Sequence, residues 1–165
     1  MPQKELRVSS LSRVISFSWL KKSTIIETIA FLFVILFVYT GTSKLSEYGV
    51  FREQIAESPI LKPVAPIVSW LLPITEFVVS LLLLIPRWRL KGLYASLALM
   101  VAFTLYVGAI LSFSRELPCS CGGIIELLSW KEHLLFNSIF ILLAITGIVL
   151  QRQLSFNNTV PLPTQ

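Results

Sequence analysis

The chain contains only two cysteines, and they lie one residue apart in the stretch Pro118-Cys119-Ser-Cys121-Gly-Gly123. Two cysteines at this spacing can form a disulfide, but the small ring is strained. Strained, exposed disulfides have more oxidising potentials and tend to be labile or catalytic. The glycines leave the backbone free to fold around the sulfurs, and the proline fixes one side of the loop. We therefore predict a redox-active pair.

Two other interpretations of the cysteines remain open. They could be inert free thiols, or they could form a disulfide that only staples the loop. A zinc site is disfavoured, because the two thiols and the only histidine, His133, supply three ligands where a structural site needs four. We predict no metal.

A second group with chemical potential follows the cysteines. Trp130, His133 and Asn137 are spaced three and four residues apart, so on a helix they share one face. A histidine at the depth of the cysteine loop can accept or pass on a thiol proton. The alternative is a histidine at the membrane surface that is satisfied by water or by a carbonyl group.

Glu76 is the one carboxylate predicted to lie deep inside a membrane span, about 13 Å from its inner end. A charge at that depth is costly unless it is paired, protonated or facing a cavity. Lys44 matches it by charge but lies at the outer end of its own helix. We therefore predict a neutral Glu76 that is hydrogen-bonded to Thr104 or Ser96, either as a structural contact or as a proton relay.

The composition indicates which elements hold these residues. Hydrophobic residues make up 55% of the 165 residues and charged residues 14%, with a mean hydropathy of +0.77. A soluble domain would carry about 25% charge, so we predict a membrane protein in contact with lipid. The net charge of +5 comes from basic clusters beside apolar segments, and no nucleic-acid motif accompanies them.

The apolar segments predict an all-α, polytopic membrane protein with a bundle of four transmembrane helices. A basic leader precedes the bundle, and it is expected to be either an amphipathic surface helix or a disordered tail. A short surface helix is expected near Phe51. The predicted units are the leader 1–24, the spans 25–45, 64–85, 93–113 and 134–150, which make up the membrane domain 25–150, and a disordered tail 151–165.

The orientation follows from the basic residues. With four spans, nine of the 14 Lys and Arg residues fall on the side that holds both termini, and five fall on the other side. Lys and Arg accumulate on the cytoplasmic side. We therefore predict a bacterial inner-membrane protein with both termini in the cytoplasm and the Cys119/Cys121 loop in the periplasm, a compartment that supports disulfides.

Several short motifs resemble the DoxX-like membrane proteins. These are Gly41-Thr-Ser-Lys44-Leu45, Ser58-Pro-Ile-Leu61 and Leu72-Pro-Ile-Thr-Glu76. The cysteine stretch, followed by Ser129-Trp130, His133-Leu134 and Asn137, is similar to the MauE branch, which comprises methylamine-utilisation proteins and their relatives. The resemblance covers 24–150. It implies a four-helix membrane protein of redox processes that works beside a thioredoxin-like partner in the maturation of a disulfide-rich periplasmic enzyme.

The leading hypothesis is thiol–disulfide exchange between the Cys119/Cys121 pair and a periplasmic thioredoxin-like protein, with His133 managing protons. A membrane quinone is considered as the electron partner, and no covalently bound cofactor is expected. The competing hypothesis is a non-enzymatic membrane scaffold or maturation factor with a structural disulfide. A small transporter that uses Glu76 is a weaker hypothesis, because the four spans show no inverted repeat.

Overall fold

The described part of the computed structural model is helical apart from short turns. It comprises residues 3–58, 61–113 and 130–159, with side chains described for 22–58, 61–112 and 132–155. No strand occurs within these ranges. The elements are α1 (Gln3–Ser46), α2 (Tyr48–Glu57), the 3-10 turn η1 (Lys62–Val64), α3 (Ala65–Leu84), α4 (Arg89–Phe113) and α5 (Trp130–Thr159).

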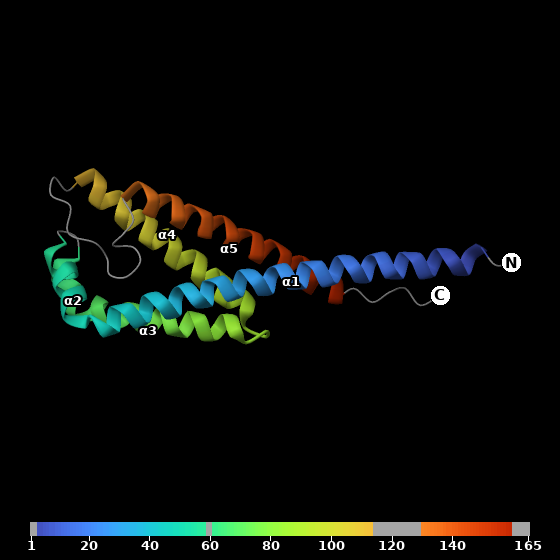
Figure 1. Cartoon of the computed structure of the whole chain (residues 1–165), viewed down its shortest axis with the longest axis horizontal. Coiled ribbons are helices and arrows are strands. Elements are labelled where there is room, and N and C mark those ends of the chain that lie inside the picture. Colours follow the sequence, from blue (N-terminus) through green and yellow to red (C-terminus); the bar gives the residue numbers. More distant parts are fainter. Residues whose placement is uncertain (1–2, 59–60, 114–129, 160–165) are drawn as a thin grey trace.

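The long helices form two antiparallel pairs (Figure 1). Helix α3 packs along α1, and α5 packs along α4. The two pairs lie close together at the α3–α4 turn and diverge toward the opposite end, where α2 lies across the bundle. We call this the α2 end. Contacts of α3 with α4, and of α1 with α5, join the pairs into one bundle.

Four of the helices are long and apolar enough to cross a membrane, which confirms the predicted fold class. The candidate spans are Lys22–Ser46, Lys62–Leu84, Arg89–Ser112 and Glu132–Ser155. Large apolar side chains cover the outside of the bundle; Leu105, for example, is 68% exposed. A lipid-facing surface has this character, because hydrocarbon solvates apolar side chains as well as a protein core does.

The core lies where the four long helices meet. Phe33 is fully buried on α1, and the Phe140 ring of α5 packs edge-on against it with the ring centroids 5.1 Å apart. Other members of this cluster come from all four helices: Ile29, Phe37, Val79, Leu83, Leu93, Met100, Ala144 and Ile148. A second, smaller cluster of Phe51, Ile55 and Ala65 fixes α2 against α3.

At both ends of the chain, the helices extend beyond the predicted spans. Residues 3–21 continue the first span as one helix, so no break separates the leader from the membrane domain. Helix α5 also continues past 150 to Thr159, so residues 151–159 are helical where a disordered tail was expected. Contacts with α1 explain this extension. Leu154 is buried, and Lys22 Nζ donates a hydrogen bond to Gln153 Oε1 at 3.0 Å.

The short surface helix expected near Phe51 is confirmed as α2, which ends before Pro59. The cysteine loop predicted within 114–129 lies outside the described residues.

Gly92 allows α3 and α4 to approach closely beside their turn. A Cβ atom at this position would lie 2.9 Å from the backbone nitrogen of Leu83 and 3.0 Å from the Leu83 side chain. Backbone atoms cannot yield as a flexible side chain does. A side chain at residue 92 would therefore force the two helices apart.

We expect Gly92→Ala to lower the thermal unfolding midpoint in detergent, because an overpacked helix contact costs about 1–3 kcal/mol. The matched control is Gly108→Ala on the same helix, where a Cβ meets nothing within 4 Å. The control should match or exceed the wild-type midpoint, since alanine favours a helix by up to about 1 kcal/mol over glycine. Equal midpoints for the two variants would contradict the close helix contact.

Candidate functional site

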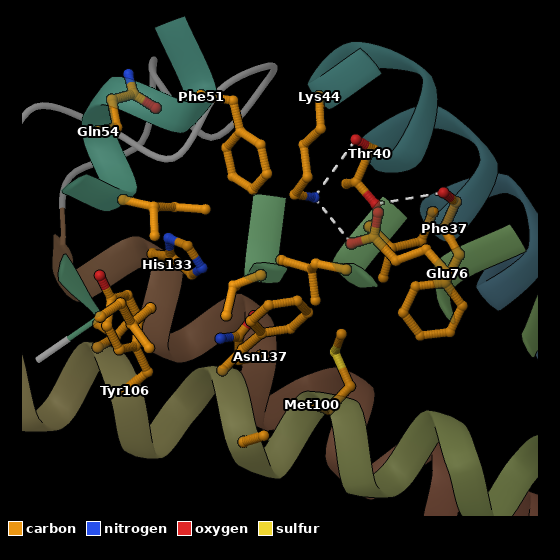
Figure 2. Close-up of a pocket in the computed structure, with 18 of the residues that line it drawn as sticks. Phe37, Thr40, Lys44, Phe51, Gln54, Glu76, Met100, Tyr106, His133 and Asn137 are labelled. Carbon is orange, nitrogen blue, oxygen red and sulfur yellow. Dashed lines mark hydrogen bonds and ion pairs between the residues drawn. The ribbon is translucent and has the colours of Figure 1, made fainter. Parts of the chain in front are cut away.

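A cavity of about 270 Å³ lies between the two helix pairs toward the α2 end (Figure 2). Most of its wall is apolar or aromatic, with Phe37, Phe51, Phe103 and Phe136 among the lining residues. Every long helix and α2 contribute to it. Seven polar side chains also line it: Thr40, Lys44, Gln54, Glu76, Tyr106, His133 and Asn137.

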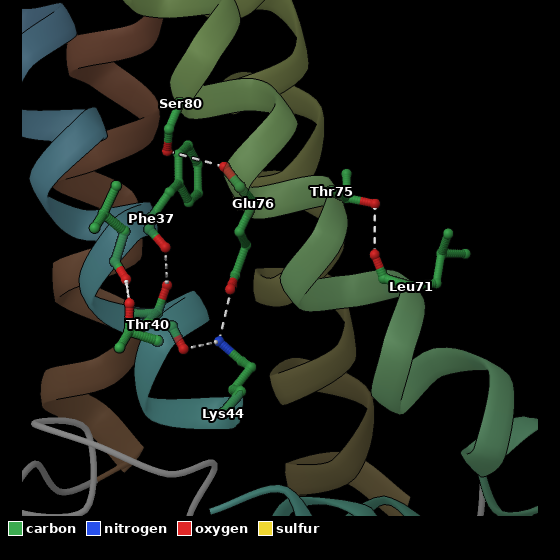
Figure 3. Close-up of polar contacts among 9 residues, drawn as sticks. Phe37, Thr40, Lys44, Leu71, Thr75, Glu76 and Ser80 are labelled. Carbon is green, nitrogen blue, oxygen red and sulfur yellow. Dashed lines mark hydrogen bonds and ion pairs between the residues drawn. The ribbon is translucent and has the colours of Figure 1, made fainter. Parts of the chain in front are cut away.

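The strongest polar contact in this wall is a buried ion pair between α1 and α3 (Figure 3). Lys44 Nζ lies 2.8 Å from Glu76 Oε1, and the two side chains are only 7% and 1% exposed. Lys44 Nζ also donates a weaker hydrogen bond to the Thr40 carbonyl oxygen at 3.4 Å. The rings of Phe51 and Phe103 flank the ammonium, with centroids 5.8 and 5.9 Å away.

This contact corrects the sequence-based prediction that Lys44 and Glu76 lie too far apart in depth to pair. The prediction compared backbone positions and ignored the direction of the side chains. Helical side chains lean toward the N-terminus of their helix. Because α1 and α3 are antiparallel, Lys44 leans into the bundle and Glu76 leans toward the α2 end, so their charged groups meet.

The predicted hydrogen-bond partners of Glu76 are also wrong. Thr104 donates to the Met100 carbonyl, and Ser96 donates to the Gly92 carbonyl, each one turn back in its own helix. Hydroxyl groups on membrane helices commonly bond to their own backbone in this way. Their hydroxyls therefore stay within α4, while Glu76 binds to α1.

Gly41 brings Glu76 against α1. A Cβ atom at this position would lie 3.2 Å from the Phe77 ring and 3.3 Å from Glu76 Oε2. A Cβ atom there would be tightly packed, and the Phe77 ring or the Glu76 carboxylate would have to shift by a few tenths of an ångström. The Gly41-Thr-Ser-Lys44 motif thus has a local physical basis, with a glycine that admits the carboxylate and a lysine that pairs with it.

Helix α5 supplies His133 and Asn137 to the same cavity. They lie one turn apart, and both are buried, at 7% and 3% exposure. The sequence predicted that they share a face, and the structure puts that face opposite Lys44 and Glu76 across the cavity (Figure 2). The side chain of Trp130, the third predicted member, lies outside the described residues.

Three buried polar atoms of the cavity residues have no hydrogen-bond partner within the described ranges. They are Gln54 Oε1, Glu76 Oε2 and Asn137 Nδ2. A buried polar group without a partner costs about 1–3 kcal/mol, so such atoms are usually satisfied by water or by a ligand. The wall therefore has hydrogen-bonding capacity that the described side chains do not use.

Sequence analysis missed Gln54 and Tyr106 as cavity residues. Tyr106 sits among apolar residues of a span, and nothing in its spacing distinguished it. Gln54 did carry a signal, because Phe51, Gln54 and Ile55 share one face of a short helix. The sequence predicted only a short surface helix here, and the structure shows that this face lines the α2 end of the cavity.

Cys119 and Cys121 themselves lie outside the described residues. The helices on either side of them are described: α4 ends at Phe113 and α5 begins at Trp130. Ile110 and His133, one turn inside these two ends, both line the cavity. No group of three or more His, Cys, Asp or Glu that could hold a metal occurs in the part of the chain that the structure describes.

Comparison with known proteins identifies the family. The sequence profile described as methylamine utilisation protein MauE matches residues 22–150. The chain belongs to the MauE family. The match spans all four membrane helices and includes every polar residue of the cavity. No curated protein and no solved structure matches the chain.

The ion pair of this MauE family member should be tested as a unit. Removing one partner of a buried pair typically costs about 3–5 kcal/mol, because the other charge is left uncompensated. We expect Glu76→Gln and Lys44→Met each to lower the thermal unfolding midpoint markedly. The double variant should recover much of the loss, and the measurement is a double-mutant cycle in detergent.

The control is Glu27→Gln. Glu27 is 59% exposed and lies 3.8 Å from Arg89 NH1, so its loss should change stability by less than about 1 kcal/mol. If Glu76→Gln unfolds at the wild-type temperature, Glu76 is not an ionised partner of Lys44, and the expectation of a neutral carboxyl group holds after all.

Proposed function

We propose that this protein is an inner-membrane redox protein that exchanges disulfides with a periplasmic thioredoxin-like partner through Cys119 and Cys121. The observation that carries the proposal is the position of the cysteine stretch in the chain. It joins the ends of α4 and α5, and residues one turn inside both ends line a cavity with buried charged and polar groups.

The chemistry needs only thiols and a disulfide. A thiolate of one protein attacks the disulfide of the other, and a mixed disulfide forms while one thiolate leaves. The second cysteine then attacks that bond, so one protein ends as the disulfide and the other as the dithiol. His133 is the proposed proton carrier, because among the side chains of α5 that the structure describes it is the ionisable one in the cavity wall.

A membrane quinone is the proposed electron acceptor for the reduced pair. Oxidation of two thiols to a disulfide releases two electrons and two protons, which convert a quinone to a quinol. The family is described by methylamine utilisation, and the resemblance implies maturation of a periplasmic enzyme. We propose that this chain also serves the maturation of a periplasmic enzyme. Both of its termini would lie in the cytoplasm.

The orientation gives the first prediction of this proposal. Because the basic clusters favour cytoplasmic termini, a membrane-impermeant maleimide should label reduced Cys119 and Cys121 in intact spheroplasts. A cysteine introduced at the C-terminus of a cysteine-free variant is the control and should be labelled only after lysis. Labelling of the native pair only after lysis would overturn both the orientation and the periplasmic exchange.

The different roles of the two cysteines give the second prediction. Cys119 follows Pro118, and Cys121 is nearer to His133 in sequence, so we assign Cys119 to the attack and Cys121 to resolution. Cys121→Ser should therefore accumulate a covalent complex with a thioredoxin-like protein, which non-reducing gels and mass spectrometry identify. Cys119→Ser should accumulate little of this complex.

The opposite pattern would exchange the two roles. If neither variant traps a complex and the double Cys119→Ser/Cys121→Ser variant keeps its function, the exchange proposal fails. The protein would then act as a membrane scaffold with a structural disulfide.

A further inference from the structure

We propose that the cavity between the helix pairs is the binding site of a quinone ring, held between aromatic side chains and the donors of Lys44 and Asn137. The redox role of this ligand rests on the function proposed above. The binding site itself rests on the cavity, its access and its unpaired polar atoms.

Access comes from the lipid. The cavity lies between transmembrane helices, and one of its lining residues, Ala102 of α4, is exposed. A ligand dissolved in the bilayer can therefore reach it without crossing water. This route favours an apolar molecule over a water-soluble metabolite.

The dimensions and wall suit a flat ring. At about 270 Å³ the cavity exceeds an apolar cavity of roughly 150 Å³ that admits benzene, so a substituted single ring or a fused double ring fits. Phenylalanines from four helices, Phe37, Phe51, Phe103 and Phe136, line it. Aromatic side chains provide flat apolar surface and favourable ring contacts.

The polar groups select for carbonyl oxygens. Lys44 carries three N–H donors, and within the described part of the chain its contacts with Glu76 Oε1 and the Thr40 carbonyl use two of them. The Asn137 amide nitrogen is buried and lacks a partner in the described part of the chain. Both groups lie on the cavity wall (Figure 2). A quinone offers two carbonyl oxygens, each of which accepts such a hydrogen bond.

The charge of the wall excludes ionic ligands. Lys44 and Glu76 neutralise each other at 2.8 Å, so an anion would meet the carboxylate and a cation would meet the ammonium. A plain acyl chain would leave the Asn137 amide without a partner. A neutral ring with polar oxygens satisfies both conditions. Reduced Cys119 and Cys121 would supply the two electrons and two protons that convert this quinone to a quinol, becoming a disulfide.

The test uses the full chain in nanodiscs, with a photoreactive azido-benzoquinone that carries a decyl tail as the probe. Illumination should attach the probe to peptides of α4 and α5 that border the cavity, identified by mass spectrometry. An excess of decyl-benzoquinone should abolish this labelling, whereas decanol should not. Equal competition by decanol would show that only the alkyl tail binds, and would overturn the proposal.

Two alanines on α4 provide matched variants. Ala102 lines the cavity and Ala98 does not, although both are exposed and lie one turn apart. Ala102→Trp should reduce probe labelling at least about tenfold by blocking the opening, and Ala98→Trp should leave it unchanged. Equal labelling of the two variants would overturn the site.

The Asn137 amide, the second proposed hydrogen-bond donor, is tested separately. Asn137→Leu keeps a similar volume but removes the amide, so the dissociation constant for decyl-benzoquinone should rise about tenfold, the effect of one hydrogen bond. Ser138→Ala is the control, because the Ser138 hydroxyl is exposed and bonds only to the Leu134 carbonyl. An unchanged constant in Asn137→Leu would overturn the assigned donor. Should Asn137→Leu fail to fold, the alanine pair still decides the site.

The cysteine-free variant separates this proposal from the exchange function. Quinone binding to Cys119→Ser/Cys121→Ser should equal that of the wild type, because the aromatic side chains and donors assigned to the ring belong to α1, α2, α4 and α5. If the quinone binds but neither single cysteine variant traps a partner complex, the binding site stands and the exchange function is refuted. A trapped complex without quinone binding would refute the site alone.

Discussion

The buried ion pair between Lys44 and Glu76 is the constraint on which the α2 end of this bundle depends. Two charges in a membrane interior are tolerated only if each compensates the other. Their pairing at 2.8 Å therefore fixes how far α1 and α3 slide past each other. Gly41 supports that register, because a Cβ atom at this position would press on the Phe77 ring and on the carboxylate, which would have to shift.

The pair also gives the cavity its chemical character. It places an ammonium and a carboxylate in the wall while keeping the wall neutral. Phe51 of α2 and Phe103 of α4 lie on two sides of the ammonium and limit its contact with water. The result is an apolar chamber with a few directed polar groups, which is the usual composition of small-molecule sites.

Helix packing and the polar cavity lie at different positions along the bundle axis. Near the α3–α4 turn, the helix pairs pack tightly, with Gly92 against the Leu83 backbone and Phe33 against Phe140. Toward the α2 end the pairs diverge (Figure 1). There the polar residues of α1, α3 and α5 line one cavity (Figure 2). A tightly packed base thus supports the end at which the pairs diverge, and this is the end where α4 stops and α5 begins. In the proposed function, the electrons and protons of the thiols would enter at this end.

The sequence by itself determined the number of membrane helices, the position of α2 and the shared face of His133 and Asn137, because hydropathy and helical spacing are local properties of the chain. It failed on the Lys44–Glu76 contact and on Gln54, and it ended the last helix too early. These features depend on how helices distant in sequence lie beside one another: Lys44 meets Glu76 through opposed side-chain directions, and Gln153 at the extended end of α5 accepts a hydrogen bond from Lys22 of α1. Only the tertiary structure decides them, because an ion pair or a cavity exists only after helices from different parts of the chain have packed.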